Sequence, residues 1–203
     1  ETERSASVLG VSVVHWLGYN DSGMTGWAQN NEPGAFIGAD VDEAATRLAD
    51  ILVAERADVL TCYDWHGGYG HPDHIQVHRV GHRAAELARA KGVASLRVFE
   101  STMNRTRIVA MMKMNPDARD DWDPEGPADD GNPFGSTEDE ITMAVDVSAF
   151  VAAKRESITC HASQVSDSSF FLQMPPDMFA IAFGTEWFIE PGAQGGAAPG
   201  WFW

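Results

Sequence analysis

The 203-residue sequence has only two cysteines, Cys62 and Cys160, and each lies in an apolar stretch. Two isolated thiols cannot supply the disulfide framework of a small extracellular domain, so both are expected to be reduced and buried, in a cytoplasmic protein. Long apolar runs are also missing. No run approaches the roughly 18 residues that a membrane span needs, so no such span is predicted.

Basic residues are scarce as well. Fourteen Lys and Arg stand against thirty Asp and Glu, which gives a formal net charge of −16. Such a surface repels phosphate backbones, so no nucleic-acid partner is expected. The sequence does contain 44% hydrophobic and 22% charged residues, as folded globular proteins do, and its length suits a single α/β core.

Segments with strand patterns alternate with segments of helical periodicity. Strands are predicted over 11–17, 58–63, 96–99, 141–147 and 186–189. Helices are predicted from Asp40 onward and over 72–91, 102–114 and 149–161, with a short one after Pro176. This alternation predicts an α/β fold, a Rossmann-like three-layer sandwich with a mostly parallel sheet, whose ligands bind at the carboxyl ends of the strands.

Three loops or tails interrupt this pattern. Residues 18–39 form a long Gly- and Asn-rich loop that contains Asp21, Ser22 and Met24, and loops of this length are usually functional. Residues 115–140 are strongly acidic but lack the spacing of a calcium loop, so a solvated excursion is predicted. Residues 1–190 are predicted to form one domain, followed by a flexible tail over 191–203.

The segment 64–74 concentrates chemically active side chains directly after the strand predicted over 58–63. It contains three imidazoles, a phenol and two carboxylates, with glycines that let the backbone approach a ligand. His71 and His74 are three residues apart at a helix start, where imidazoles on one side could bind a metal. The alternative is a simple helix cap formed by His71, with Asp73 complementing the helix dipole.

The sequence G-G-Y-G-H-P-D-H-x-x-x-H-R over 67–79 resembles the signature of the zinc-dependent N-deacetylases of the PIG-L/LmbE-like family. Further stretches are similar to actinobacterial members of that family, and the likeness covers about residues 5–190. These stretches lie at 9–11, 17–24, 134–135, 141–147, 154–155 and 161–164.

The resemblance implies a role for each matching residue. His74 would be a zinc ligand, His71 would act on the transition state or the leaving amine, and Tyr69 would polarise the carbonyl oxygen. Asp73 would orient an imidazole. The loop residues Asp21, Ser22 and Met24, with His66, are expected to contact an amino-sugar substrate. Zn²⁺ is the cofactor implied, and the reaction is hydrolysis of an acetamide to acetate and a free amine.

The sequence departs from the family in one large respect. The family motif A-H-P-D-D-E, which brings the other zinc ligands and a general base, is not found. Because the sequence opens inside a predicted helix, we interpret it as an N-terminally truncated fragment that lacks the first strand or strands and the metal motif, and that is inactive alone. The oligomeric state is not indicated by the sequence.

Alternatives to the deacetylase interpretation remain open. The chain could be a non-catalytic sugar-binding module of the same fold, or an amidase that cleaves a larger sugar–acyl conjugate. His78 and His82 continue the four-residue spacing from His74, but a helix rising about 1.5 Å per residue carries them away from the site. Structural roles are therefore predicted for both, and His66 is equally compatible with a plain loop position.

Overall fold

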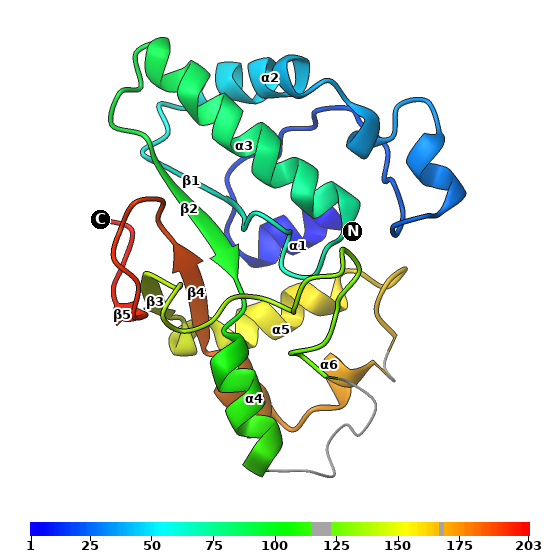
Figure 1. Cartoon of the computed structure of the whole chain (residues 1–203), viewed down its shortest axis with the longest axis vertical. Coiled ribbons are helices and arrows are strands. Elements are labelled where there is room, and N and C mark those ends of the chain that lie inside the picture. Colours follow the sequence, from blue (N-terminus) through cyan, green and yellow to red (C-terminus); the bar gives the residue numbers. More distant parts are fainter. Residues whose placement is uncertain (115–122, 167–168) are drawn as a thin grey trace. The chain divides into compact units, whose positions relative to one another are not determined.

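The structure is a computed structural model, which describes residues 1–114, 123–166 and 169–203 (Figure 1). The chain folds as two compact units. The smaller comprises Glu1–Trp16 and Val145–Glu186, and the larger comprises Leu17–Ala144 and Trp187–Trp203. The mixed α/β character expected from the alternating pattern is confirmed.

The larger unit is built around two long helices, α2 over Val41–Ala54 and α3 over Pro72–Ala90. The carboxylate of Asp40 accepts a hydrogen bond from the Glu43 backbone N–H at 2.8 Å, which confirms the predicted start of α2. Pro72 occupies the first turn of α3, where its missing N–H costs nothing. The two helices lie side by side in Figure 1.

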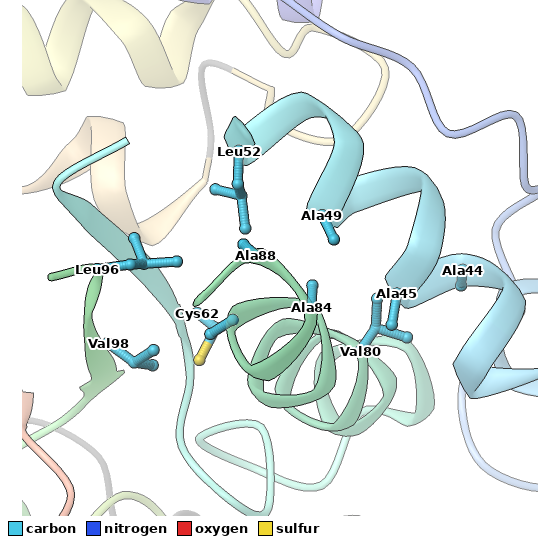
Figure 2. Packing of buried hydrophobic residues seen from close by; sticks show 11 residues of the cluster. Ala44, Ala45, Ala49, Leu52, Cys62, Val80, Ala84, Ala88, Leu96 and Val98 are labelled. Carbon is cyan, nitrogen blue, oxygen red and sulfur yellow. The ribbon is translucent and has the colours of Figure 1, made fainter. Parts of the chain in front are cut away.

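Small residues form much of the interface between α2 and α3. Figure 2 shows alanines of the two helices facing each other, next to Leu52 and Val80. Alanine side chains let the helix axes approach closely, and the seam then continues onto residues of the sheet. The buried cluster comprises Ala44, Ala45, Ala49, Leu52, Cys62, Val80, Ala84, Ala85, Ala88, Leu96 and Val98.

Five strands form one sheet in the order β1-β2-β4-β3-β5. β1 (Val59–Tyr63) and β2 (Arg97–Thr102) are parallel, and β3 (Met143–Asp146) is parallel to β5 (Ala198–Pro199). β4 (Thr185–Ile189) runs antiparallel to β2. These strand pairs are therefore parallel except at β4, in keeping with the predicted, mostly parallel sheet.

Shorter elements complete the larger unit. The loop predicted over 18–39 is irregular, as expected, with 3₁₀ turns η1 (Ala28–Asn31) and η2 (Phe36–Gly38). Helix α4 spans Arg105–Met114, three residues later than the predicted start, because β2 extends to Thr102. Part of the predicted acidic excursion over 115–140 lies outside the described residues, and 123–140 consists of turns and bridges.

The smaller unit is helical. It contains α1 (Thr2–Val8), η4 (Ser148–Phe150), α5 (Val151–Thr159), α6 (Phe170–Gln173) and α7 (Pro176–Phe183). The hydroxyls of Ser5 and Ser157 join α1 to α5 at 2.6 Å, and Phe179 is fully buried. The Lys154 ammonium donates to the Phe183 carbonyl at 3.0 Å, which satisfies one of the last acceptors of α7.

Two local predictions differ from the structure. The strand predicted over 11–17 is wrong, because these residues are irregular and pair with no strand in the described chain. A β-branched run needs a neighbour to complete its backbone hydrogen bonds, and Val11, Val13 and Trp16 are instead exposed. At the other end, the predicted tail over 191–203 contains β5, and the ring centroids of Phe202 and Phe99 lie 5.0 Å apart.

No helix in the described parts of the chain is both long enough and apolar enough to cross a bilayer.

Candidate active site

Three loops of the larger unit converge at the carboxyl end of β1. They are 21–26, the glycine-rich loop 64–71 with the start of α3, and 129–135. The Ser22 backbone N–H donates to the Asp73 carboxylate at 2.9 Å, and the Thr25 N–H donates to the Asp129 carboxylate at 3.1 Å. The Asp129 N–H in turn donates to the Tyr69 carbonyl at 3.0 Å, so hydrogen bonds connect all three loops to one another.

Two glycines are required where these loops touch. Gly67 has φ +69°, and a Cβ there would lie 2.5 Å from the Cβ of His74. Gly70 has φ +90°, and a Cβ there would lie 2.3 Å from the Asp130 backbone nitrogen. Both positions combine a left-handed backbone with a contact too close for any side chain. The glycines therefore let the loop pack directly against α3 and the 129–135 loop.

A buried carboxylate organises the turn. Asp64 is fully buried, and its Oδ1 accepts from the Gly68 N–H at 2.8 Å and from the His66 N–H at 3.3 Å. His66 is 1% exposed, and its Nδ1 lies 3.6 Å from a carboxylate oxygen of Asp130. His66 is thus placed inside the loop packing, behind the surface that it was predicted to line.

His74 is held on two sides. Its Nδ1 lies 3.1 Å from the Gly67 carbonyl, and its ring stacks on Tyr63 with centroids 3.9 Å apart and an interplanar angle of 6°. A carbonyl oxygen only accepts, so Nδ1 carries the proton and Nε2 presents a lone pair. Burial lowers the pKa of His74, which favours the neutral ring that a metal ligand must be.

His71 is the N-cap of α3, as the helix-cap alternative predicted. Its Nδ1 accepts a hydrogen bond from the Asp73 backbone N–H at 3.1 Å. In the neutral ring the proton must then sit on Nε2, which makes that atom a hydrogen-bond donor. Capping and catalysis would use different nitrogens of this imidazole, so the cap does not exclude a catalytic role.

Tyr69 completes a cluster of three rings. Its ring meets His74 edge-on at 5.2 Å and His71 at 6.1 Å between centroids, and the two imidazoles are 4.7 Å apart. Burial, with nearby negative groups as smaller causes, raises the pKa of the Tyr69 phenol. The hydroxyl therefore stays protonated at neutral pH and can donate a hydrogen bond. These three residues, chosen from the sequence, are brought together.

Asp73 has a contact that the sequence did not suggest. Its Oδ2 accepts from the Ser22 N–H, while Oδ1 is buried and has no hydrogen-bond partner among the described residues. The observed bond ties the start of α3 to the 21–26 loop. The predicted role of Asp73 in orienting an imidazole stays a prediction.

The substrate-binding residues predicted in the 18–39 loop differ in their surroundings. Asp21 is exposed, and its Oδ1 accepts from the Gly23 N–H at 2.8 Å. Ser22 is fully buried, and its hydroxyl accepts from the Ile37 N–H at 2.9 Å, so it supports the loop. Met24 is half-buried.

A zinc ion needs about three protein ligands at a catalytic site. His74 offers one nitrogen in the required form. Within residues 1–114, 123–166 and 169–203, however, the group of three metal-ligating side chains that lie close together is Cys62, His78 and His82, which does not include His74. The described residues around His74 therefore fit zinc as a single ligand and do not complete its site.

Sequence reasoning missed several residues that shape this site. Tyr63 supports the His74 ring, Asp64 organises the glycine turn, and Asp130 lies against His66 and Gly70. An aspartate placed before a glycine-rich turn is a recognisable signal for Asp64. Asp130 had no comparable signal, since its partner lies more than fifty residues away in the sequence.

Comparisons of the sequence with known proteins identify the family of this chain. The family model described as GlcNAc-PI de-N-acetylase, PIG-L, matches residues 1–85. A relative from Geodermatophilus obscurus is 32% identical over 219 residues, covering 99% of this chain and 73% of its own length. The chain belongs to the PIG-L family. This confirms the family resemblance of the glycine–histidine signature.

Two further PIG-L relatives are similar over nearly all of the chain. One from Salinispora arenicola is 37% identical over 202 residues, and one from Acidothermus cellulolyticus is 36% identical over 194 residues. All three relatives are named 1D-myo-inositol 2-acetamido-2-deoxy-alpha-D-glucopyranoside deacetylase. The chain spans 65% of the length of each of these two relatives.

Proposed function

We propose that this chain is part of a metal-dependent hydrolase that removes the acetyl group from an N-acetylated amino sugar or its conjugate. The observation that carries the proposal is the cluster of Tyr69, His71 and His74 at the carboxyl end of β1. The names of the relatives support an acetamido sugar linked to inositol as the substrate class.

His74 is assigned as one ligand of the family's zinc ion, through Nε2. The hydrogen bond from Nδ1 to the Gly67 carbonyl and the stack on Tyr63 would fix the ring for this task. The other ligands are not among the described residues near His74, so the steps that follow involve only side chains of this chain.

His71 and Tyr69 would act on the acetamide. As water adds to the carbonyl carbon, negative charge develops on the oxygen, and donors placed in advance stabilise it. The Tyr69 O–H and the His71 Nε2–H are two such donors on adjacent rings. To protonate the departing amine, the His71 ring would first have to carry a proton on Nδ1 as well, which gives up the bond from the Asp73 N–H; the imidazolium would then release its Nε2 proton and return to the neutral ring, and the products are acetate and the free amino sugar.

Asp21 would bind a sugar hydroxyl. One carboxylate oxygen accepts from the Gly23 N–H, and the residue is exposed in the 21–26 loop, next to Ser22, whose N–H donates to Asp73. A carboxylate held in a fixed turn can accept from a hydroxyl with little loss of side-chain entropy, which favours positioning of a polyol.

The test is acetate release from an N-acetylglucosaminyl inositol by the intact protein, compared with its His71→Ala and Lys91→Ala variants. Lys91 is an exposed residue at the C-terminal end of α3, the helix that His71 caps at its start, and serves as the control. The proposal expects His71→Ala to lower kcat by about 10²–10⁴-fold, with Lys91→Ala unchanged. Wild-type kcat in His71→Ala would overturn the assignment.

A second candidate is a sugar-binding module without hydrolysis. The observation in its favour is that His74 belongs to no group of three metal-ligating side chains among the described residues. The same experiment separates the two functions if binding is measured alongside acetate. A module would bind the amino sugar by calorimetry while releasing no acetate even with excess Zn²⁺.

A further inference from the structure

A group of metal-ligating side chains lies where α3 packs on β1. Cys62 on β1 and His78 and His82 on α3 offer ligand atoms that all lie within 4.8 Å of one another. The two histidines are four residues apart, so they share one face of the helix, and their ring centroids are 4.4 Å apart. The group does not include His74.

The packing of α3 on β1 brings the thiol to the helix. A Cβ at Gly81 would lie 3.1 Å from the Cβ of Cys62, so the absence of a side chain at this position lets the helix close on the strand. Cys62 is 6% exposed, whereas the side chains of His78 and His82 are 21% and 32% exposed. An ion from solvent can therefore reach the group past the histidines.

Glu100 adds a buried carboxylate beside the group. It stands opposite Cys62 in the parallel register of β1 and β2. Its Oε1 lies 2.7 Å from His82 Nε2 and 3.8 Å from His78 Nδ1. A carboxylate in contact with the imidazoles fixes their orientation and raises their basicity, as at many metal sites.

We propose that Cys62, His78 and His82 bind a divalent transition-metal ion at a site separate from His74. Among such ions, Zn²⁺ suits this set of ligands best. One thiolate and two imidazoles are ligands that zinc takes in proteins, with Zn–S near 2.3 Å and Zn–N near 2.0 Å. Bonds of these lengths place the ligand atoms of a tetrahedral site about 3.5 Å apart. The observed ligand atoms, which lie within 4.8 Å of one another, would therefore need to move by about 1 Å to bind one ion. The thiol proton leaves to solvent as the bond to sulfur forms.

Charge and hydrogen bonding fit this ion. Its two positive charges would be balanced by the Cys62 thiolate and the Glu100 carboxylate, so the half-buried site would carry no net charge. His78 Nδ1 lies 3.1 Å from the Tyr63 carbonyl, which only accepts, so that nitrogen carries the proton and Nε2 is left to ligate.

The ion would act as a clamp between β1 and α3. Tyr63 follows Cys62 directly, its carbonyl binds His78, and its ring stacks on His74. Fixing Cys62 to α3 therefore fixes the residue that supports His74. The competing explanation is that His82 and Glu100 form only a hydrogen-bonded pair with no metal.

The test uses cobalt as a spectroscopic substitute for zinc. The metal-free intact protein is titrated with Co²⁺ alone, and a thiolate-to-cobalt charge-transfer absorption is expected in the near ultraviolet. This band should disappear in Cys62→Ser and persist in Cys160→Ser, the other buried free cysteine, and in His74→Ala. Added Zn²⁺ should displace the cobalt and bleach the band.

A second variant covers the case in which Cys62→Ser does not fold. His82 is partly exposed, so His82→Gln should keep the fold while it weakens Co²⁺ binding at least about tenfold. In a His74→Ala background, which disables the other proposed zinc site, Zn²⁺ should raise the Tm, and this rise should be lost when His82→Gln is added. A wild-type protein without the thiolate band, a band that survives in Cys62→Ser, or wild-type Co²⁺ affinity in His82→Gln would overturn the proposal.

Discussion

The ring of Tyr63 lies flat against the imidazole of His74, with 3.9 Å between centroids and 6° between planes. The two residues come from the last position of β1 and the first turn of α3, so the stack ties the strand end to the helix start. The hydrogen bond from His74 Nδ1 to the Gly67 carbonyl restrains the same ring from a second direction.

Replacing Tyr63 should loosen His74. Tyr63→Ala removes the stacking surface, so the imidazole gains rotational freedom, and zinc affinity should fall by about 10–100-fold, as when other supporting groups of a metal ligand are removed. Tyr63→Phe keeps the ring and should bind zinc like the wild-type protein. Zinc affinity of both variants of the intact protein, measured by competition with a chelator, tests this. Equal affinity in Tyr63→Ala would show that the stack has no positioning role.

Alanine variants of His74 and His71 should distinguish the role of a zinc ligand from that of a hydrogen-bond donor to the substrate. His74→Ala should remove most of the bound catalytic zinc together with activity, because too few ligands remain to hold the ion. His71→Ala should keep the zinc content and lower kcat with little change in KM, since its donor would act mainly in the transition state. Zinc content and steady-state kinetics are measured on both. Loss of zinc in His71→Ala would contradict the division of roles.

Gly70 and Gly68 provide a matched pair for stability. Gly70→Ala imposes a side chain at φ +90° that would collide with the Asp130 backbone, so the free energy of unfolding should fall by about 2–4 kcal/mol. Gly68 has φ +75° with open space around its Cβ position, so Gly68→Ala should lose only about 1 kcal/mol from the backbone strain. Urea unfolding of both variants gives the comparison. Equal losses would mean that the 129–135 loop yields to the new methyl group.

Cys62 should make the protein sensitive to alkaline pH. Burial, with Glu100 and Asp64 as smaller causes, raises the pKa of the Cys62 thiol from 9.0 to about 12. Its stabilising effect is complete below the unfolded pKa and is lost as pH rises towards the folded pKa, because only the unfolded thiol ionises in that window. In metal-free protein, stability should therefore fall less steeply between pH 9 and 12 in Cys62→Ala than in the wild-type protein.

The urea midpoint at several pH values measures this slope. Cys160→Ala retains Cys62 and should follow the wild-type slope, which makes it the control. A Cys62→Ala protein that loses stability with pH as steeply as the wild-type protein would show that the buried thiol is not responsible.

Local signals in the sequence were sufficient for the starts of α2 and α3 and for the ring cluster. Asp40 with Glu43 and Pro72 mark helix starts because capping depends on neighbours within one turn. Tyr69, His71 and His74 come together for the same reason, since a tight turn followed by a helix start keeps residues so close in sequence close in space. These features are determined by short-range backbone geometry.

Long-range pairing was decided by the tertiary structure. The segment over 11–17 has the composition of a strand yet forms none, because strand formation needs a partner that composition does not specify. Composition likewise does not specify three long-range contacts of the site. These are Asp130 beside His66, the hydrogen bond from the Ser22 N–H to Asp73, and Cys62 beside His78. Each contact depends on how β1, α3 and the loops pack. Packing brings together residues that are far apart in the sequence, and no local sequence pattern predicts that they will touch.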